Sequence, residues 1–446
     1  MSAWIIQSWL RLRASYYFIP TLMGLSAILL GVLTTIIDLK FQAEIRDLLG
    51  WFFASTVTSA RSVLTVIAGS MISVAAVTFS LTMVAVTTAA GQYGPRLIGN
   101  FMRDRANQVT LGMFISTFLY CIVVLKSVSE EITIDAQSTV GLTPSLSVLV
   151  ALILTLISVG VLIFFVHHIP ETLNVGTLTG KVSRQLIHQI KQGRFPSSEN
   201  LDVGNVESLG DPFDPKLTQS VRSRSSGYVE AISLGGLVEW ADENKMRIRL
   251  LRVPGDFVMF GEAVMDVIND DVTADFDHNV FETETAKDLL SFIALGRERT
   301  EFQNLLFLSD ELVEIAARAL SPGVNDPFTA INCIHRYGDI CLAMMNAPAA
   351  PDCVLGEDRT PRIWARPVSV KRLYDALFGQ SRQYICEDEN ASRETLEVLY
   401  QLKSRTSETF EGVISDQIET LKVAIQQSSM GDAQKARLSS APPYQF

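Results

Sequence analysis

Polar residues that could take part in chemistry are concentrated in one run in the second half of the chain. The run from Ala319 to Ala330 reads Ala-Leu-Ser-Pro-Gly-Val-Asn-Asp-Pro-Phe-Thr-Ala. Its candidate functional residues are Ser321, Pro322, Gly323, Asn325, Asp326 and Pro327. Polar side chains on a loop held by rigid helices are frequent binding or catalytic groups. The same run also fits a helix stop followed by a helix start, in which Asn325 or Asp326 caps the new helix.

Cysteine and histidine residues and short catalytic motifs would indicate metal binding or enzymatic catalysis. Cys333, His335 and Cys341 have the spacing Cys-x-His-x5-Cys, which matches no common zinc arrangement, so we interpret the two thiols as buried. His167 and His168 are adjacent and point apart on a helix, which favours interfacial packing over a metal site. The chain has no phosphate-binding loop, dinucleotide glycine pattern, His-Glu-x-x-His motif or nucleophile elbow. The sequence therefore predicts no enzyme, no metal and no cofactor.

Hydroxyl groups offer a third chemistry, because many of them lie in the apolar stretch between Arg61 and Arg96. The residues that we expect to line an aqueous path are Ser70, Ser73, Thr78, Ser80, Thr82 and Thr87. Arg61, Gln92 and Arg96 would stand at the mouths of that path, where basic rings favour anions. A second interpretation makes this stretch the most buried helix of a bundle, with hydroxyls bonded across helix interfaces and arginines on lipid phosphates.

Four uncharged apolar stretches must position these residues, and they cover positions 16–37, 62–95, about 108–125 and about 146–166. A helix crosses the hydrocarbon core of a bilayer with about 20 residues. The second stretch would extend about 50 Å as a helix, so it must tilt, break or project into water. No ionisable residue lies inside any of the four stretches, which argues against a proton relay or an ion-coupled carrier. The sequence predicts an integral membrane protein.

The charge distribution divides the 446 residues into two parts. Up to His168 there are nine Lys or Arg against seven Asp or Glu, and beyond it 28 against 41. The second part is therefore acidic, which excludes general nucleic-acid binding because phosphate contacts need clustered cations. Five cysteines in so long a chain exclude a disulfide scaffold. Basic residues are in excess before the first stretch, after the second and after the fourth, which places both termini in the cytoplasm.

The second half of the chain predicts an α+β cytoplasmic domain. Apolar periodicity predicts an amphipathic helix over 171–192, a loop rich in Gly and Ser to about 226, short strands to 268, helices from 282 onward and a polar, frayed tail from 428. Among the expected helices are 368–378 and 392–427. The predicted domains are residues 1–169 (four transmembrane helices), 170–225 (amphipathic helix and linker), 226–270 (a small β module), 271–430 (a helical bundle) and 431–446 (the tail).

Two resemblances add to this interpretation. The run Gly-Asp-Phe-Val-x-x-Gly-x-x-x-x-x-Val from Gly255 to Val267 resembles the hairpins of lipoyl- and biotinyl-type barrel-sandwich modules, without a counterpart of their carrier lysine. The runs Val77 to Ala85 and Gln92 to Leu97, the stretch after Gln108, and the Ser-Pro-Gly-x-Asn-Asp-Pro run resemble a bacterial family of integral membrane proteins of unknown function. That resemblance implies an inner-membrane protein with four spans and a large cytoplasmic domain, and it supplies no activity.

Two functions of different classes remain open. In the first, copies of the chain assemble around an axis, the second stretch lines a pore and the cytoplasmic domain forms a vestibule or gate. In the second, the spans only anchor a sensor or scaffold whose acidic domain binds a cytoplasmic protein or a small ligand. Both need the lipid bilayer as a partner, and the first needs a homo-oligomer.

Overall fold

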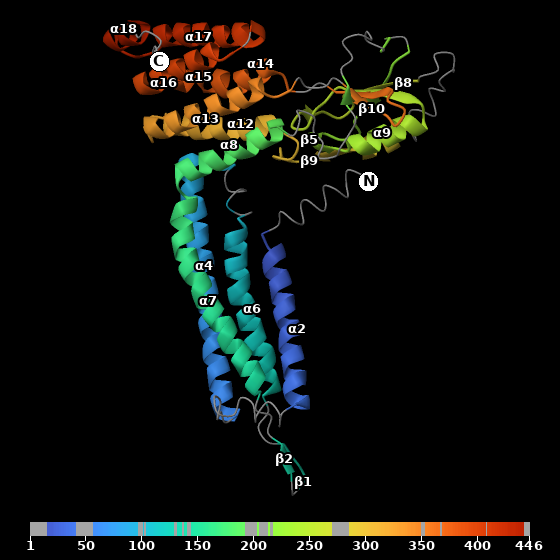
Figure 1. Cartoon of the computed structure of the whole chain (residues 1–446), viewed down its shortest axis with the longest axis vertical. Helices are drawn as coiled ribbons and strands as arrows, with labels where there is room; N and C mark the ends of the chain where they lie inside the picture. The colour runs from blue at the N-terminus through green and yellow to red at the C-terminus, as the bar shows by residue number, and fades with distance from the viewer. Residues whose placement is uncertain are drawn as a thin grey trace. The chain divides into compact units, whose positions relative to one another are not determined.

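The computed structural model describes residues 16–41, 57–96, 101, 104–128, 132–135, 138–140, 144–191, 203–204, 213–214, 217–269, 285–348, 353–365, 368–406 and 408–440 (Figure 1). By contacts, the chain divides into two units. Residues 12–91 and 95–174 form the membrane unit, and residues 92–94 and 175–446 belong to the α+β unit. This division confirms a helical membrane part followed by an α+β part.

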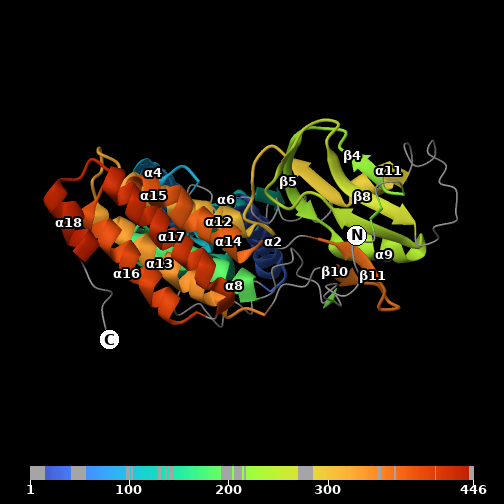
Figure 2. The same cartoon turned by 90° about the horizontal axis from the view of Figure 1, so that it is seen from above.

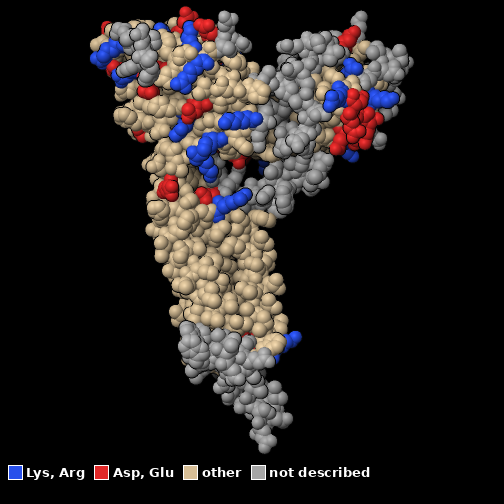
Figure 3. Space-filling model, in the orientation of Figure 1, with Lys and Arg blue, Asp and Glu red and all other residues tan. Residues whose placement is uncertain are grey.

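Four helices of the membrane unit are each long and apolar enough to cross a bilayer, which confirms the four predicted stretches. They are α2 (Phe18–Lys40), α4 (Val57–Tyr93), α6 (Arg105–Ser127) and α7 (Ser145–Thr172). A short hairpin, β1 (Ile132–Asp135) with β2 (Ser138–Val140), lies between α6 and α7. The surface of these helices is free of coloured charges along most of its height in Figure 3. α4 has 37 residues, or about 55 Å of helix, and therefore exceeds the hydrocarbon core as expected.

Helices α2 and α6 pack closely because glycines lie in their seam. A Cβ added at Gly31 would lie 3.0 Å from Cγ1 of Val123, and one at Gly112 would lie 2.6 Å from Sδ of Met23. Small residues allow such approach between membrane helices. α7 packs on both helices, and α6 is the most buried of the four spans. We call this α2–α6 contact the seam.

α4 packs on the same bundle through longer side chains. Leu64, Ile67 and Met71 are buried in one apolar cluster with residues of α6 and α7, such as Phe114 and Val148. The backbone of α4 comes near those of the other described helices at few points, in contrast to the seam. The remaining surface of α4 is exposed, so this helix is not the most buried one, as the second interpretation of its hydroxyls required.

The strands of the α+β unit that the structure describes form two sheets. One has the order β3-β10-β11-β6-β8-β4 and the other the order β7-β5-β9. Their bounds are β3 (Val203–Gly204), β4 (Gln219–Arg222), β5 (Gly227–Ile232), β6 (Met246–Leu250), β7 (Phe257–Val258), β8 (Ala263–Asn269), β9 (Ile293–Gly296), β10 (Cys353–Leu355) and β11 (Pro361–Trp364). Helices α9 (Leu234–Glu243) and α11 (Ala286–Ser291) accompany them. β6 pairs in parallel with β11 and antiparallel with β8.

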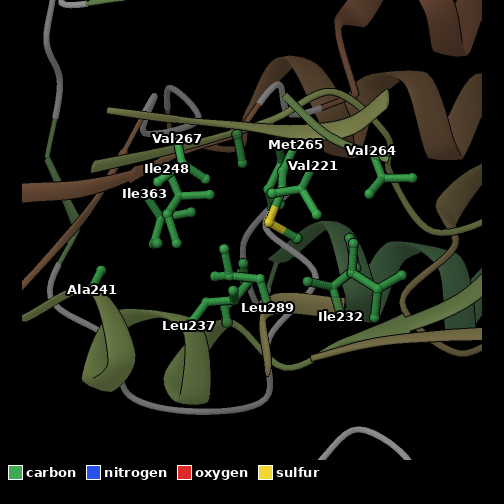
Figure 4. Close-up of a cluster of buried hydrophobic side chains, with 14 of the residues drawn as sticks. Val221, Ile232, Leu237, Ala241, Ile248, Val264, Met265, Val267, Leu289 and Ile363 are labelled. Carbon is green, nitrogen blue, oxygen red and sulfur yellow. The ribbon is translucent and has the colours of Figure 1, made fainter. Parts of the chain in front are cut away.

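The core of the β part lies between the large sheet and the elements facing it (Figure 4). In register, Ile248 pairs with Val267 on one side and with Ile363 on the other, so three branched side chains share one face of the sheet. Leu237 of α9 and Leu289 of α11 approach that face from the opposite side in Figure 4, and both are fully buried. Alternation along each strand thus produces one apolar face.

Helices make up the rest of the α+β unit and gather at one end of it in Figure 2. They are α8 (Val175–Lys191), α12 (Leu305–Ala319), α13 (Pro327–Met345), α14 (Val370–Tyr374), the π-helix η2 (Asp375–Gly379), α15 (Gln380–Ile385), α16 (Glu389–Ser404), α17 (Glu408–Gln427) and α18 (Asp432–Ser440). The amphipathic helix expected at 171–192 is confirmed as α8, which packs its apolar face on α12 and α13. Tyr337 is fully buried and donates its hydroxyl to the carbonyl of Leu312 at 3.3 Å.

The structure differs from the sequence prediction beyond residue 282. Strands β9, β10 and β11 lie where only helices were expected. β9 pairs with β5 and β11 pairs with β6, which are remote in sequence and leave no local signal, whereas β10 and β11 form a short local hairpin that the sequence prediction missed. The helix predicted over 392–427 is broken after α16 by Arg405, and the one over 368–378 continues as a π-helix. Within the predicted tail, α18 forms and ion-pairs through Arg437 to Glu389 of α16 at 2.8 Å. The predicted loop to residue 226 lies mostly outside the described residues.

Candidate functional site

The first candidate site is one face of α4, which we call the outer stripe. It consists of seven exposed small residues: Ser62, Gly69, Ser73, Ala76, Ser80, Thr87 and Gly91. Their spacings of three, four and seven residues put them on one side of a helix with 3.6 residues per turn. Outside α4, no described residue comes within 4 Å of the positions where Gly69 and Gly91 would carry a Cβ. In the part of the chain that the structure describes, no other element fills this face at Gly69 and Gly91.

The structure separates the six predicted pore-lining residues into two groups. Ser73, Ser80 and Thr87 belong to the outer stripe, and Ser70 is exposed beside it. Thr78 and Thr82 are only 3% and 4% exposed and lie on the opposite, bundle-facing side of α4. A single chain therefore leaves four of the six available to line a path, and it encloses the other two in its own packing.

In the outer stripe, the hydroxyls of Ser73 and Thr87 satisfy their donors within α4. Ser73 donates its Oγ hydrogen to the carbonyl of Gly69 at 2.8 Å, and Thr87 donates to Met83 at 2.9 Å. A hydroxyl has one donor and two acceptor sites, so its oxygen keeps capacity to accept a hydrogen bond from outside the helix. The exposed part of the stripe is thus an acceptor surface rather than a donor surface.

The exposed faces of α2 and α7 differ in chemistry from the outer stripe. They carry large apolar side chains: Leu22, Leu25, Leu29 and Leu33 on α2, and Leu156, Ile163, Phe164 and Val166 on α7. Lipid tails pack well against branched apolar side chains of this kind. On α4, Val66, Val77 and Val84 are also exposed and flank the stripe. The small residues therefore form a narrow strip with apolar shoulders.

The three predicted pore-mouth residues have different surroundings. Arg61 is half-buried and donates its Nη2 to the carbonyl of Val128 at 3.1 Å, at the C-terminal end of α6. A cation is favourable there because carbonyl groups at a helix C-terminus are unpaired and carry partial negative charge. Gln92 and Arg96 are exposed at the opposite end of α4. Arg61 consequently has a structural role within one chain, whatever else it does.

The end of α4 continues into the predicted run from Gln92 to Leu97. Residues 92–94 group by contact with the α+β unit. Gly94 has a φ of +125°, and a Cβ added there would lie 2.6 Å from Oε1 of Glu314 in α12. Both the positive φ and the close approach require glycine at this position.

Sequence reasoning missed Asp38, an acidic residue that the structure buries in α2. It is 2% exposed and accepts from the backbone N–H of Leu146 at 3.0 Å and of Ser147 at 2.9 Å. The hydroxyl of Ser147 donates to the same carboxylate at 2.6 Å. Asp38 therefore caps the N-terminus of α7 from another helix, where a negative charge is stabilised by unpaired N–H groups. The signal available in the sequence was an acid directly after the first apolar stretch.

A polar network continues from that cap into the bundle. The hydroxyl of Tyr120, which is fully buried, donates to the carbonyl of Ser147 and lies 3.0 Å from Oγ1 of Thr34. Further along α6, Thr117 lies 3.1 Å from Oγ of Ser158 in α7. At the other end of α6, Asp104 caps the helix and contacts His168 of α7 at 3.3 Å. These polar groups link α2, α6 and α7.

The second candidate site, the run from Ala319 to Ala330, forms the turn between α12 and α13. Asp326 caps α13, since its Oδ1 accepts from the N–H of Thr329 at 3.1 Å and its Oδ2 from the hydroxyl of Thr329 at 2.6 Å. Asn325 has a φ of +51°, and Asp326 donates its N–H to the carbonyl of Ala319 at 2.8 Å. Pro327 opens α13, and Val324 and Phe328 are exposed. Helix capping accounts for the polar groups of Asp326, and the run presents an apolar surface.

The remaining candidates lie apart from one another. Cys333 and Cys341 are fully buried, and burial raises the pKa of both thiols well above the ordinary value. His335 points instead to Glu394 of α16, with Nε2 2.7 Å from its carboxylate. Among the described residues, no group of three or more His, Cys, Asp or Glu is arranged to hold a metal ion.

Comparisons with known proteins give the family of this chain. Residues 13–401 match the family described as "Predicted membrane protein (DUF2254)". The chain is 29% identical over 346 residues to the uncharacterised proteins MT1328 and Rv1290c of Mycobacterium tuberculosis and Mb1321c of Mycobacterium bovis. That region covers 77% of this chain and 63% of each relative, so the chain spans less than two thirds of their length. No solved structure matches it. Because the match extends over most of its residues, this protein belongs to the DUF2254 family of predicted membrane proteins.

Proposed function

We propose that this protein is an oligomeric conduit for small ions or water in a bacterial inner membrane, in which the outer stripes of several copies face a central axis. The observation that carries the proposal is the outer stripe itself, whose small residues are exposed among the described residues and whose Gly69 has open space beside it. Small residues on a membrane helix permit close approach of another backbone. A face of this kind against lipid would leave poorly filled space, which the large side chains of α2 and α7 avoid.

The hydroxyls of the outer stripe support a hydrated path. Ser73, Ser80 and Thr87 are seven residues apart, so each step along α4 rises about 10.5 Å. In a symmetric oligomer, every such position becomes a ring of hydroxyl oxygens. Because the donors of Ser73 and Thr87 already bond to α4, their oxygens face the axis as acceptors for water or a cation. The acceptor surface favours cations inside the path. This replaces the anion preference expected from basic mouths, because Arg61 is bonded to the carbonyl of Val128. Arg96, beside Gln92, is the predicted basic residue that remains a candidate at the cytoplasmic mouth.

The α+β unit completes the proposal as a cytoplasmic vestibule or gate. Basic residues in excess before α2, after α4 and after α7 support cytoplasmic termini, since positive residues stay on that side. With that orientation, the acidic second half of the chain lies in the cytoplasm. An acidic vestibule would raise the local concentration of cations, in agreement with an acceptor-lined path.

Cysteine cross-linking of the full chain in lipid nanodiscs tests the proposal. The five native cysteines are buried, so a new exposed cysteine is oxidised selectively. We expect Ser80→Cys to form disulfide-linked dimers under mild oxidation. Leu156→Cys is the matched control, because Leu156 is 74% exposed on the apolar surface of α7. This variant should stay monomeric on a denaturing gel. Light scattering should give the mass of a closed oligomer for both.

Bilayer recording then tests conduction. Reconstituted protein should conduct, and Ser80→Trp should abolish the current, because a bulky side chain on the outer stripe either fills the path or separates the copies. A silent oligomer, or a monomer whose Ser80→Cys variant does not cross-link, would overturn the conduit. That outcome would move the assignment to an anchored sensor or scaffold that acts through the α+β unit.

A further inference from the structure

The β part of the α+β unit contains a cavity that the conduit does not use. Its volume is about 340 Å³, at the small end of the range for ligand pockets. It opens between the large sheet and β9, with α11 on one side and the turn between β4 and β5 on the other. The lining residues are Ser223, Arg224, Ser225, Val264, Lys287, Leu290, Ser291, Ile293 and Leu295.

The lining has an apolar floor and a polar, basic rim. Val264 and Ile293 are buried beneath it, and Leu290 and Leu295 are half-buried. Arg224 and Lys287 come from different elements and are the charged members of the described lining, which holds no acidic residue. Two cations and no carboxylate stand out in a half of the chain where acids outnumber bases by 41 to 28.

Hydrogen bonds hold the turn that carries Arg224. Ser223 is 3% exposed, and its hydroxyl donates to the carbonyl of Ser225 at 2.6 Å. The backbone N–H of Ser223 donates to Glu262 at 2.9 Å, and its carbonyl accepts from Gly261 at 2.9 Å. The rim is therefore attached to the turn between β7 and β8 before any ligand arrives, and little ordering of the backbone is needed on binding.

We propose that this cavity binds a small organic anion, with a phosphate or carboxylate between Arg224 and Lys287 and an apolar body on Leu290 and Leu295. Guanidinium and ammonium groups recognise such anions through charge-assisted hydrogen bonds, and the hydroxyls of Ser225 and Ser291 add neutral contacts at the rim. The anion is a soluble metabolite or the headgroup of an anionic lipid, since both offer the same chemistry. The proposal goes beyond the conduit and does not depend on it, because every residue of the site lies in the α+β unit.

Protection of Lys287 from acylation tests the site in the full chain in nanodiscs of phosphatidylcholine. The probe is 1-naphthyl phosphate, and the rate of modification of each lysine is measured by peptide mass spectrometry. We expect the probe to slow acylation of Lys287 while leaving Lys245, an exposed lysine of the same β part, unaffected. Neutral 1-naphthol should give no protection, and inorganic phosphate should protect only at a concentration at least about tenfold higher, because it lacks the apolar contacts.

Two variants and one control define the contacts. Arg224→Gln should raise the half-protecting concentration about tenfold, the usual size of one charge-assisted hydrogen bond. Ser291→Trp fills the mouth from an exposed position and should abolish protection. Arg359→Gln removes an equal charge from an exposed turn outside the lining and should change nothing. Equal protection of Lys245, protection by 1-naphthol, or no protection at millimolar probe would each overturn the proposal.

Nanodiscs of different lipid composition distinguish the two possible sources of the anion. Protection of Lys287 in nanodiscs that contain phosphatidylglycerol, without added probe, would assign the site to a lipid headgroup. An unchanged rate in those nanodiscs, together with protection by the soluble probe, would assign it to a metabolite.

Discussion

Two regions of the membrane unit use the same kind of residue to opposite effect. In the seam, Gly31 and Gly112 are in contact with Val123 and Met23, so their missing side chains are replaced by those of a neighbouring helix. In the outer stripe, Gly69 and Gly91 have open space beside them. Glycine in a helix costs about 1 kcal/mol relative to alanine, which the seam recovers through close packing. Among the described residues, none packs against the Cβ position of Gly69 to recover this cost, and a second copy is the partner that would make the composition of the stripe favourable.

The largest effect should come from filling each region with the same side chain. Gly112→Leu places atoms against Met23 and the backbone of Pro20, 3.2 Å from the new Cβ, and should lower the free energy of unfolding by about 3 kcal/mol. Outside α4, no described residue lies within 4 Å of the position of the new Cβ in Gly69→Leu. This variant should therefore change the free energy of unfolding of the monomer by no more than about 0.5 kcal/mol. Detergent titration followed by circular dichroism measures both.

The oligomeric mass provides the second half of this comparison. Gly69→Leu should reduce the mass in light scattering, because the added side chain separates the copies. If Gly69→Leu instead destabilised the isolated chain as strongly as Gly112→Leu, the stripe would be an internal interface and the contrast would fail.

A smaller effect is expected at the polar end of the seam. Asp38→Asn keeps the shape of the side chain but removes the charge that three donors share, and it should cost about 2 kcal/mol. Loss of stability with an unchanged oligomeric mass would show that Asp38 stabilises the single chain and takes no part in contacts between copies. Asp339→Asn, at an exposed carboxylate of α13, is the matched control and should have no measurable effect. A change in mass without a change in stability would show that Asp38 acts between copies.

Sequence reasoning reached the four spans because their length and composition are local properties. It also found the hydroxyls of α4 but assigned all six to one path. The spacing held the missing information, because Ser73, Ser80 and Thr87 repeat every seven residues whereas Thr78 and Thr82 fall on the other side of a 3.6-residue helix. Which side is exposed depends on Leu64 and Met71 packing into the bundle, and that is a tertiary property.

The β part shows where local signals end. Ile363 of β11 pairs in parallel with Ile248 of β6, more than one hundred residues earlier. The sequence of neither strand indicates which strand it pairs with. Parallel pairing requires a long crossover, so periodicity alone assigned the later region to helices. The basic rim of the cavity could not be predicted for the same reason, because Arg224 and Lys287 line one cavity only in the folded β part.

The smallest expected effect is a pH dependence of the stability of the α+β unit. It comes from α13, where Cys333 and Cys341 are fully buried but can lose a proton. Burial raises the pKa of Cys333 and Cys341, so the folded α+β unit holds these protons more tightly than the unfolded chain. The stability that this provides is complete below the ordinary thiol pKa of about 8.5 and is lost as the pH rises above it. Each thiol should lower the free energy of unfolding by up to about 1.4 kcal/mol per pH unit there.

Pulsed thiol labelling in urea measures this dependence in the full chain, because Cys341 reacts only when its surroundings open. Between pH 9 and pH 10, unfolding should shift to lower urea in the native chain. Cys333→Ala should be less stable at pH 7, since it loses buried volume, yet it should show a shallower decline above pH 9. An equal slope in both chains would mean that Cys333 is ionised to the same extent in the folded and unfolded states. The packing around α13 would then be as open as the outer stripe, and the distinction between filled and unfilled faces would no longer hold for this residue.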